Sequence, residues 1–333
     1  MASRRSERKT VQHLSPIQLE PKLDCRLWGG SALGPFVGLA SPPPNLAEIW
    51  LVYEDNRVVG GPHDGAMLKD LVGLYGPALV GTRSFDRWGE DFPLLAKFID
   101  AADDLSVQVH PDDEYAHAVE AATGFHGKTE AWHILQATPE AAVIHGFTSR
   151  TDREQFADAV ARGTALDTLR VVPVQAGDTI FVPAGTMHAI NAGVMLFEIQ
   201  EKSDLTYRVY DYDRRDAQGQ LRDLHIDKAL AVTNFDTAAP AKLAAVPLAP
   251  GRSLLVECPY FVMERWEMSE ATSLATDAAT FEILTVIGGA VDVVSEDGVV
   301  HLPRGHAVVL PATLGAYQLV PAPDVTLLRC YVP

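Results

Sequence analysis

Short runs in which apolar and polar residues alternate recur along most of the chain, and they predict β-strands. The segment 105–110 alternates most clearly, with polar positions at Ser106, Gln108 and His110. Side chains two residues apart lie on one face of a strand, so these three should point the same way. Further strands are expected at 92–99, 132–135, 142–145, 171–174, 179–182, 194–199, 254–257, 261–267, 281–287, 290–295, 307–310 and 325–331.

Two segments carry helical spacing instead. Residues 64–75 place apolar side chains near every third or fourth position, with Asp64 as the expected N-cap and Gly76 as the expected stop. Residues 151–162 suit a second helix. The stretch 238–250 is rich in Ala and Pro and predicts a linker or a covering of a sheet edge. Many short strands with few helices favour an all-β sandwich or barrel over a parallel α/β sheet.

The sequence contains an internal repeat. The segments Gly177-x5-Pro183 and Gly305-x5-Pro311 each enclose an apolar strand between a turn glycine and a proline. The first copy continues as x-Gly-x2-His188, whereas the position equivalent to His188 in the second copy is Ala316. We therefore expect two copies of one β unit, with polar chemistry in the first copy only.

Composition and charge narrow the class of protein. The chain has 333 residues and a net charge of −17, from 27 Lys and Arg against 44 Asp and Glu. A nucleic-acid surface needs clustered cations and is not expected, since the basic residues at positions 4 to 9 fit a flexible tail over residues 1–20. No apolar run reaches 18 residues and no signal-peptide core follows the tail, so no membrane span is expected. Three cysteines make no disulfide framework, which favours the reducing cytoplasm.

Candidate metal ligands gather around the segment 105–110 and the first copy of the repeat. They are Gln108, His110, Glu130 and His188. Two imidazoles, one carboxylate and one amide oxygen suit a divalent transition metal, most of all zinc. Because an amide is a weak zinc ligand, such a site should keep room for water or a substrate hydroxyl.

Several motifs resemble those of known families. The motif at 177–188 resembles the second signature of the cupin superfamily, although the usual His-x-His of the first signature is replaced by Gln108-x-His110. A larger set of segments resembles the type I mannose-6-phosphate isomerases, above all their short bacterial form. These segments are Trp28-Gly29-Gly30, 105–113, 127–130, 182–190 and 204–214. They occur in the family's order, which makes the resemblance specific, while the C-terminal third shares only a general β character.

The resemblance implies roles for nine residues. The family's zinc ligands fall on Gln108, His110, Glu130 and His188. Its catalytic arginine falls on Arg208, and a glutamate ten residues earlier falls on Glu198. Its substrate-facing positions fall on Lys97, Ser106 and Lys128.

The implied reaction interconverts mannose 6-phosphate and fructose 6-phosphate through a cis-enediol. A base must move a proton between C1 and C2, and Glu198 is one candidate, with Lys128, His126 and His133 as alternatives. Arg208 suits either the enediolate oxygens or the phosphate, because its fork matches both. A net charge of −17 repels a phosphorylated substrate, so a local cationic pocket of Lys97, Lys128 and Arg208 is expected.

These arguments predict an all-β protein of two cupin or jelly-roll barrels with a few peripheral helices. Residues 21–235 should form the catalytic, metal-binding cupin, and 236–333 a metal-free, cupin-like copy. We expect one zinc ion per chain, a sugar-phosphate substrate, a monomer or homodimer, and neither nucleic acid nor membrane as partner. Two alternatives remain open, a cupin oxygenase with ferrous iron and a non-catalytic sugar-binding or regulatory cupin. The Gln ligand and the Lys and Arg set argue against the oxygenase.

Overall fold

The computed structural model describes residues 14–149, 151–215, 218–236 and 240–333. The basic cluster at positions 4 to 9 therefore lies outside the described residues. Leu14 and Ile17 are already buried, and Ile17 forms a β-bridge with Val309. The packed chain thus begins before residue 21, where the sequence placed the end of a flexible tail.

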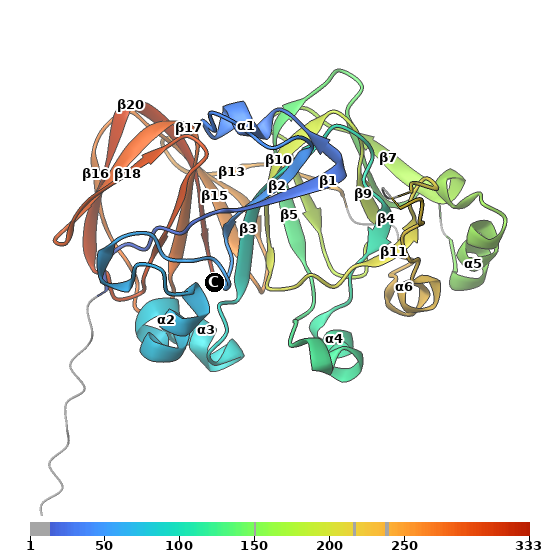
Figure 1. Ribbon diagram of the computed structural model, residues 1–333, viewed down its shortest axis with the longest axis horizontal. Helices are drawn as coiled ribbons and strands as arrows, with labels where there is room; N and C mark the ends of the chain where they lie inside the picture. The colour runs from blue at the N-terminus through green and yellow to red at the C-terminus, as the bar shows by residue number, and fades with distance from the viewer. Residues whose placement is uncertain (1–13, 150, 216–217, 237–239) are drawn as a thin grey trace, which may run out of the picture.

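The described strands pair antiparallel into three sheets (Figure 1). The first sheet runs in the order β1 (Lys22–Gly30), β2 (Leu46–Val52), β3 (Leu94–Ala101), β10 (Val194–Glu201), β5 (Glu130–Ala137), β8 (Thr179–Val182) and β12 (Lys242–Leu243). The second contains β11 (Tyr207–Tyr210), β4 (Val107–Val109), β9 (His188–Ile190), β6 (Ala142–Phe147) and β7 (Leu169–Pro173). The third contains β13 (Val246–Ala249), β14 (Arg252–Glu257), β15 (Val262–Met268), β20 (Ala316–Tyr331), β17 (Glu282–Ser295) and β18 (Gly298–Pro303), with β16 (Thr272–Ala275) on β20 and β19 (Ala307–Leu310) on β17.

Short helices lie around these sheets. They are α1 (Leu33–Phe36), α2 (Leu68–Tyr75), α3 (Pro77–Trp88), α4 (Asp113–Val119), α5 (Arg153–Ala161) and α6 (Ile226–Val232), with 3-10 turns at Gly61–His63, Ala121–Thr123 and Ala165–Thr168. The mainly β class predicted from the sequence is confirmed. Strand pairing gives open sheets that face one another rather than closed barrels. Within the described residues, no helix combines the length and apolar character needed to cross a membrane.

The inner strands of the first sheet are buried on both faces. One face packs against the second sheet, through a core that includes Trp132 and Leu196. The other face packs against the third sheet, through a larger core in which Phe98 and Phe197 meet residues such as Phe281. Every residue of β3 and β10 is consequently buried. The two halves of the chain therefore share their central sheet.

The internal repeat is visible in the backbone. Gly177 and Gly305 both adopt positive φ, at 91° and 86°. Each precedes a four-residue strand, β8 or β19, and a proline, and the next strand begins five residues after that proline. Those next strands begin at His188 and at Ala316, as the repeat predicts. The boundary proposed at 235/236 stays a prediction, and β12, which follows it, pairs with β8 of the first sheet.

Local signals explain where the sequence expectations hold and where they fail. The helix expected at 64–75 ends at Gly76 but begins only at Leu68, because the Asp64 carboxylate accepts the Gly60 N–H at 2.7 Å and so closes an earlier turn. Helix α5 lies within 151–162 as expected. Helices α3, α4 and α6 were not predicted. Part of the Ala- and Pro-rich stretch 238–250 forms β12 and β13, while residues 237–239 lie outside the described residues.

Gly81 allows α3 to contact the second half of the chain. Its φ of 81° interrupts the helix. The next residues, Thr82 and Arg83, donate backbone N–H groups to the carbonyls of Ala278 and Ala279 at 3.2 and 3.0 Å. A Cβ at position 81 would lie 2.4 Å from the Ala279 carbonyl oxygen. Only glycine fits both the conformation and this close approach.

We predict that Gly81→Ala lowers the free energy of unfolding by about 1–3 kcal/mol, through backbone strain and the contact with Ala279. Gly73→Ala is the matched control, because Gly73 lies in α2 with ordinary φ and open space around it. That variant should be neutral or more stable by ~0.5–1 kcal/mol. Urea denaturation measures both, and equal effects would contradict the role assigned to Gly81.

Candidate active site

Two rows of polar side chains face each other between the first and second sheets. On the first sheet, Lys97 of β3, Glu198 of β10 and Trp132 of β5 lie directly opposite one another in register. On the second, Arg208 of β11, Gln108 of β4 and His188 of β9 are likewise paired. Strand register alone thus brings together residues more than 100 positions apart in the sequence.

The four predicted metal ligands gather where the two rows meet. The ligand atoms of His110, Glu130 and His188 lie within 4.8 Å of one another, and all three residues are buried. The Glu130 carboxylate oxygens lie 3.5 Å from His110 Nε2 and 3.3 Å from His188 Nε2. Gln108 completes the set, since its side-chain amide lies 3.4 Å from His188 Nε2. A 180° flip of the amide exchanges its nitrogen and oxygen, so the oxygen can occupy the same place.

The hydrogen bonds of the two imidazoles aim them at Glu130. His110 Nδ1 donates to the Leu205 carbonyl at 2.7 Å, and His188 Nδ1 donates to the Thr186 carbonyl at 2.8 Å. Each Nε2 is therefore left with a lone pair that faces the carboxylate, which is the arrangement found around metal-bound histidines. Burial lowers the pKa of His188 to about 3 and also lowers that of His110. Both rings are thus neutral near pH 7, as metal ligands must be.

Glu130 carries the charge of the set. Although burial opposes its ionisation, the Lys128 ammonium holds the pKa of Glu130 well below its usual range. Glu130 Oε2 is fully buried, and the Lys128 ammonium lies 2.8 Å from it. A buried, ionised carboxylate beside two neutral imidazoles and an amide fits a divalent transition metal. Gln108, His110, Glu130 and His188 are the residues that would hold it.

Lys97 is enclosed between two acids. Its ammonium lies 3.3 Å from Glu48 Oε2 and 3.2 Å from Glu198 Oε1. Burial acts to lower the pKa of Lys97, but the charges of Glu198 and Glu48 outweigh it and raise the pKa. Glu198 is fixed by Trp132, whose indole N–H donates to Oε2 at 2.8 Å. Burial, together with the nearby charge of Glu130, raises the pKa of Glu198 above its usual value.

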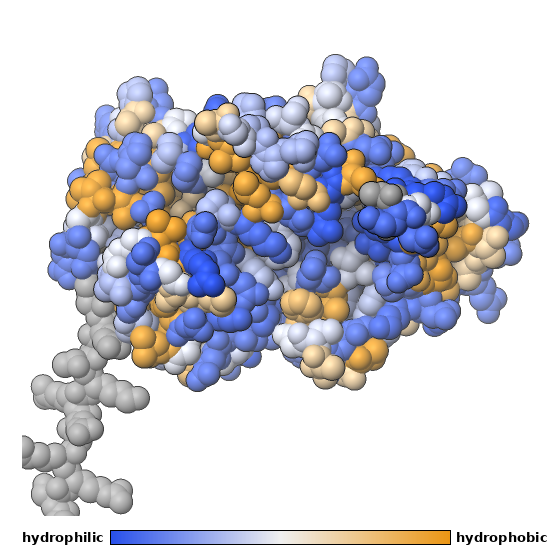
Figure 2. All heavy atoms as spheres, viewed as in Figure 1, coloured by the Kyte–Doolittle hydropathy of each residue, from blue (hydrophilic) through white to orange (hydrophobic). Residues whose placement is uncertain are grey.

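These side chains line one cavity of about 310 Å³ between the two sheets. On the molecular face shown in Figure 2, hydrophilic residues gather around a hollow between β1 and β11. Lys97, Ser106, Gln108, Lys128, Glu130, Glu198 and Arg208 all line the cavity. His110 and His188 lie behind its wall, in contact with Glu130. All nine residues predicted from the sequence are thus brought to one place.

Two of the alternative bases lie elsewhere. His133 points to the other face of β5, where its ring bonds the Thr179 hydroxyl at 3.2 Å. His126 bonds Asp91 at 3.1 Å in a separate cluster. Neither histidine lines the cavity, so the hypothesis that one of them is the base does not agree with the geometry of the site. Strand alternation explains His133, because it follows the inward-facing Trp132 by one residue.

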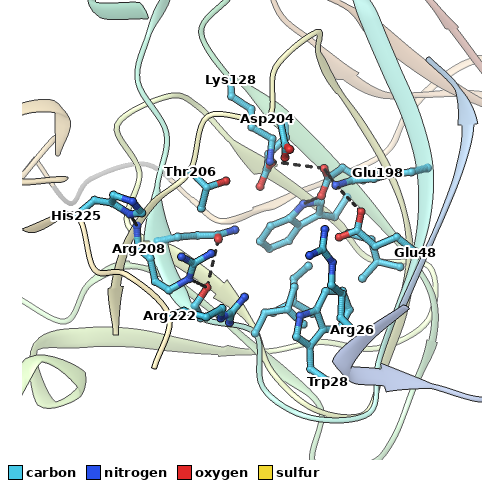
Figure 3. A pocket seen from close by; sticks show the side chains of 18 residues that line it. Arg26, Trp28, Glu48, Lys128, Glu198, Asp204, Thr206, Arg208, Arg222 and His225 are labelled. Atoms are coloured by element: carbon cyan, nitrogen blue, oxygen red, sulfur yellow. Dashed lines mark hydrogen bonds and ion pairs between the residues drawn. The ribbon is translucent and has the colours of Figure 1, made fainter. Parts of the chain in front are cut away.

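The sequence predicted Arg208 in the cavity, but two further arginines that line it, Arg26 and Arg222, were missed. Figure 3 shows Arg208 and Arg222 on the side opposite Lys128 and Glu198, with Arg26 near Trp28 and Glu48. Arg208 Nε donates to the Ser106 hydroxyl at 3.2 Å, and its Nη1 donates to the Asp223 carbonyl at 3.2 Å. Arg26 could have been predicted, because it lies two residues before Trp28 of the Trp28-Gly29-Gly30 motif. Arg222 could not, because it lies in a charged stretch without a recognisable motif.

Comparison with known proteins gives this cavity a family. Residues 17–136 match the family described as phosphomannose isomerase type I, catalytic domain, and residues 252–331 match the cupin domain of mannose-6-phosphate isomerase. The chain is 36% identical over 321 residues to the mannose-6-phosphate isomerase ManA of Bacillus subtilis, covering 91% of this chain and 95% of that relative. The chain belongs to the type I mannose-6-phosphate isomerase family. This membership confirms the resemblance inferred from the motifs.

Further relatives agree with membership of the type I mannose-6-phosphate isomerases. The mannose-6-phosphate isomerase of Streptococcus mutans is 34% identical over 310 residues, with 91% of this chain and 94% of that protein covered. The crystal structure of the mannose 6-phosphate isomerase from Bacillus subtilis matches with a TM-score of 0.85 at 31% identity, covering 95% of this chain and 99% of that one. A mutant of phosphomannose isomerase from Salmonella typhimurium, at 17% identity and a TM-score of 0.79, covers 96% of this chain and all of its own, and shares the fold.

The buried ion pairs of Lys97 generate a prediction about stability. Lys97→Met leaves the carboxylates of Glu48 and Glu198 buried without their shared cation, so the free energy of unfolding should fall by about 3–5 kcal/mol. Adding Glu198→Gln to Lys97→Met should restore part of that loss. Lys242→Met is the control, because it removes an exposed pair with Asp178 and should cost at most about 1 kcal/mol. Similar losses for Lys97→Met and Lys242→Met in urea denaturation would refute the account.

Proposed function

We propose that this chain interconverts mannose 6-phosphate and fructose 6-phosphate through a cis-enediol, with one zinc ion at the Gln108, His110, Glu130 and His188 set. One observation carries the proposal. Two candidate zinc ligands, Gln108 and Glu130, and the buried acid Glu198 line one cavity together with Arg26, Arg208 and Arg222, and Arg208 and Arg222 lie across the cavity from Glu198. A sugar phosphate needs a proton-transfer group at one end and cations for its phosphate at the other. The family relatives named above support this substrate class.

Zinc would supply a positive charge that stabilises the enediolate oxygens at C1 and C2. The donor set supports this choice of metal, because two neutral imidazoles and one carboxylate suit zinc, and the amide leaves the site less tightly held than a thiolate would. Lys128 also belongs to this end of the cavity. Its ammonium lies 2.8 Å from Glu130 Oε2 and 3.1 Å from His110 Nε2. We assign Lys128 to the substrate oxygens beside the metal.

Glu198 is the proposed proton carrier. Trp132 holds Oε2, so Oε1 is the atom free to act, and it lies 3.2 Å from Lys97 and 3.9 Å from Lys128. A pKa raised by burial brings the carboxyl closer to neutral pH, where it exchanges a proton most effectively. Glu198 takes the proton from C2 of the aldose and returns it to C1, while the hydroxyl proton of O2 passes to O1, which gives the ketose. The two lysines keep the carboxylate positioned between these two transfers.

The arginine end is proposed to bind the phosphate. Arg208 presents a planar fork, and although burial lowers its pKa, a guanidinium stays charged at neutral pH. Arg222 is held by a bidentate pair with Asp211. These cations answer the difficulty of the net charge of −17, because they give a local positive field inside an acidic protein. The substrate would thus lie with its carbonyl end toward Glu198 and its phosphate toward Arg208.

Location and assembly remain proposals. Cys25 is exposed, Cys258 and Cys330 are buried, and all three are free thiols. Free thiols suit the reducing cytoplasm, where we place the enzyme, as a monomer or homodimer.

Zinc dependence can be tested with metal-defined protein. Chelator-stripped enzyme should lose turnover of mannose 6-phosphate by at least about 10²–10³-fold, and zinc should restore it, because the charge stabiliser returns. His188→Ala should stay inactive after zinc is added. His306→Ala is the control, since this exposed histidine lies in the third sheet region, away from the cavity, and should behave as wild type. Full activity of stripped wild-type enzyme would overturn the zinc proposal, and zinc binding without turnover would favour the non-catalytic alternative.

The role of Glu198 makes a separate prediction. Glu198→Gln keeps the bond to Trp132 and the shape of the strand, but it cannot carry a proton. Its kcat should fall by about 10²–10⁴-fold with little change in KM. His133→Gln is the matched control on the far face of β5 and should keep its activity. If Glu198→Gln turns over within a few-fold of wild type, while its zinc content is unchanged, Glu198 is not the base and Lys128 is the remaining candidate.

A further inference from the structure

A second group of side chains that could bind a metal ion lies outside the cavity, at α4. Asp113, His117 and His126 each offer one ligand atom, and these atoms lie within 4.8 Å of one another. Asp113 and His117 are four residues apart on α4 and so share one face of the helix. His126 comes from the loop after the 3-10 turn Ala121–Thr123. None of these residues lines the active-site cavity.

The histidine contacts resemble those of a metal site. His126 is buried, and its Nε2 lies 3.1 Å from the carboxylate of Asp91. That bond fixes the ring and turns Nδ1 toward His117 Nε2, at 3.0 Å. A carboxylate behind one ring nitrogen, with the other nitrogen facing further ligands, is the usual support of a metal-bound histidine.

An independent observation comes from Glu201, beside Asp113. Glu201 is 2% exposed, and its Oε2 accepts the Thr129 N–H at 2.7 Å. Its Oε1 is a buried atom with no hydrogen bond of good geometry among the described residues. The carboxylate of Asp113 lies next to it. Two neighbouring carboxylates of this kind need a proton or a cation between them.

The surrounding charges leave an excess of negative charge. Four carboxylates belong to this cluster, those of Glu54, Asp91, Asp113 and Glu201. Two cations face them: Lys202 lies 3.3 Å from both Glu54 and Asp91, and Arg87 lies 3.5 Å from Asp113. Carboxyl groups thus outnumber the cations beside them, which favours binding of a further cation here.

We propose that Asp113, His117 and His126 bind a second divalent transition metal ion, of the zinc class, with its fourth position open to water. Asp113 Oδ1 already accepts the Gly127 N–H at 2.9 Å. The ion would therefore join α4 to the loop that continues into Lys128 and Glu130. Its role is structural, because it lies outside the cavity and holds the start of the segment that carries two active-site residues.

The experiment counts zinc ions per chain, by elemental analysis after dialysis of zinc-loaded full-length protein against zinc-free buffer. Wild type should hold two ions, His117→Ala one, His188→Ala one, and the double variant none. His117 is exposed, so its replacement should not disturb the fold. His117→Ala should also keep its turnover, because the active-site ion remains. His306→Ala, another exposed histidine, is the control and should retain two.

Each other outcome is decisive. One ion in wild type that His188→Ala removes and His117→Ala keeps would overturn the second site and leave the active-site zinc standing. One ion that only His117→Ala removes would support the second site and refute the active-site zinc. A second ion that persists in His117→Ala would show adventitious binding elsewhere and overturn the proposal. Should His188→Ala fail to fold by circular dichroism, wild type against His117→Ala still decides, since equal zinc contents would refute the site.

Discussion

The pairing register of β10 with β3 and β5 is the constraint on which the site depends. It sets Glu198 opposite both Lys97 and Trp132, so that all three face the second sheet. A slip of one residue would turn Glu198 toward the opposite face of the sheet, where Phe98 and Phe197 pack in the larger core. Because the inner strands of the first sheet are buried on both faces, no other register gives each charge a partner and each aromatic ring a core.

The buried charged residues distinguish this part of the sheet from an ordinary apolar core and make it a candidate active site. Lys97 is 6% exposed and Glu198 2%, so neither reaches enough water to stay ionised alone. The charge of Lys97 is balanced by two acids, and that of Glu130 by Lys128, beside the two candidate metal-binding histidines. The chain thus keeps its reactive groups dry and charged, which strengthens every electrostatic interaction with a bound substrate. Removing any one of these charged groups leaves its partners buried without a counter-charge, which destabilises the fold.

Much of this site could be read from the sequence because strand alternation is a local signal. Gln108 and His110 were placed on one face from their spacing, and Glu198 was identified through the family resemblance. Glu48, an acid within the apolar strand β2, was overlooked. Arg222 could not be found, since its place beside Arg208 depends on how a charged loop returns to the sheet. Helix α3 was missed because Gly81 breaks its periodicity and because its packing partner, around Ala279, is almost 200 residues away.

The central sheet shared by the two halves also bears on how the two halves depend on each other. The second copy of the repeat has Ala316 where the first has His188, and its sheet now covers the outer face of β3 and β10. Phe92 from the first half and Phe281 from the second pack with ring centroids 4.7 Å apart across this junction. Because that face is apolar, either half alone would present a large hydrophobic surface to water. The two halves are therefore mutually dependent, and the copy without ligands serves as the wall behind the strands that carry the candidate site.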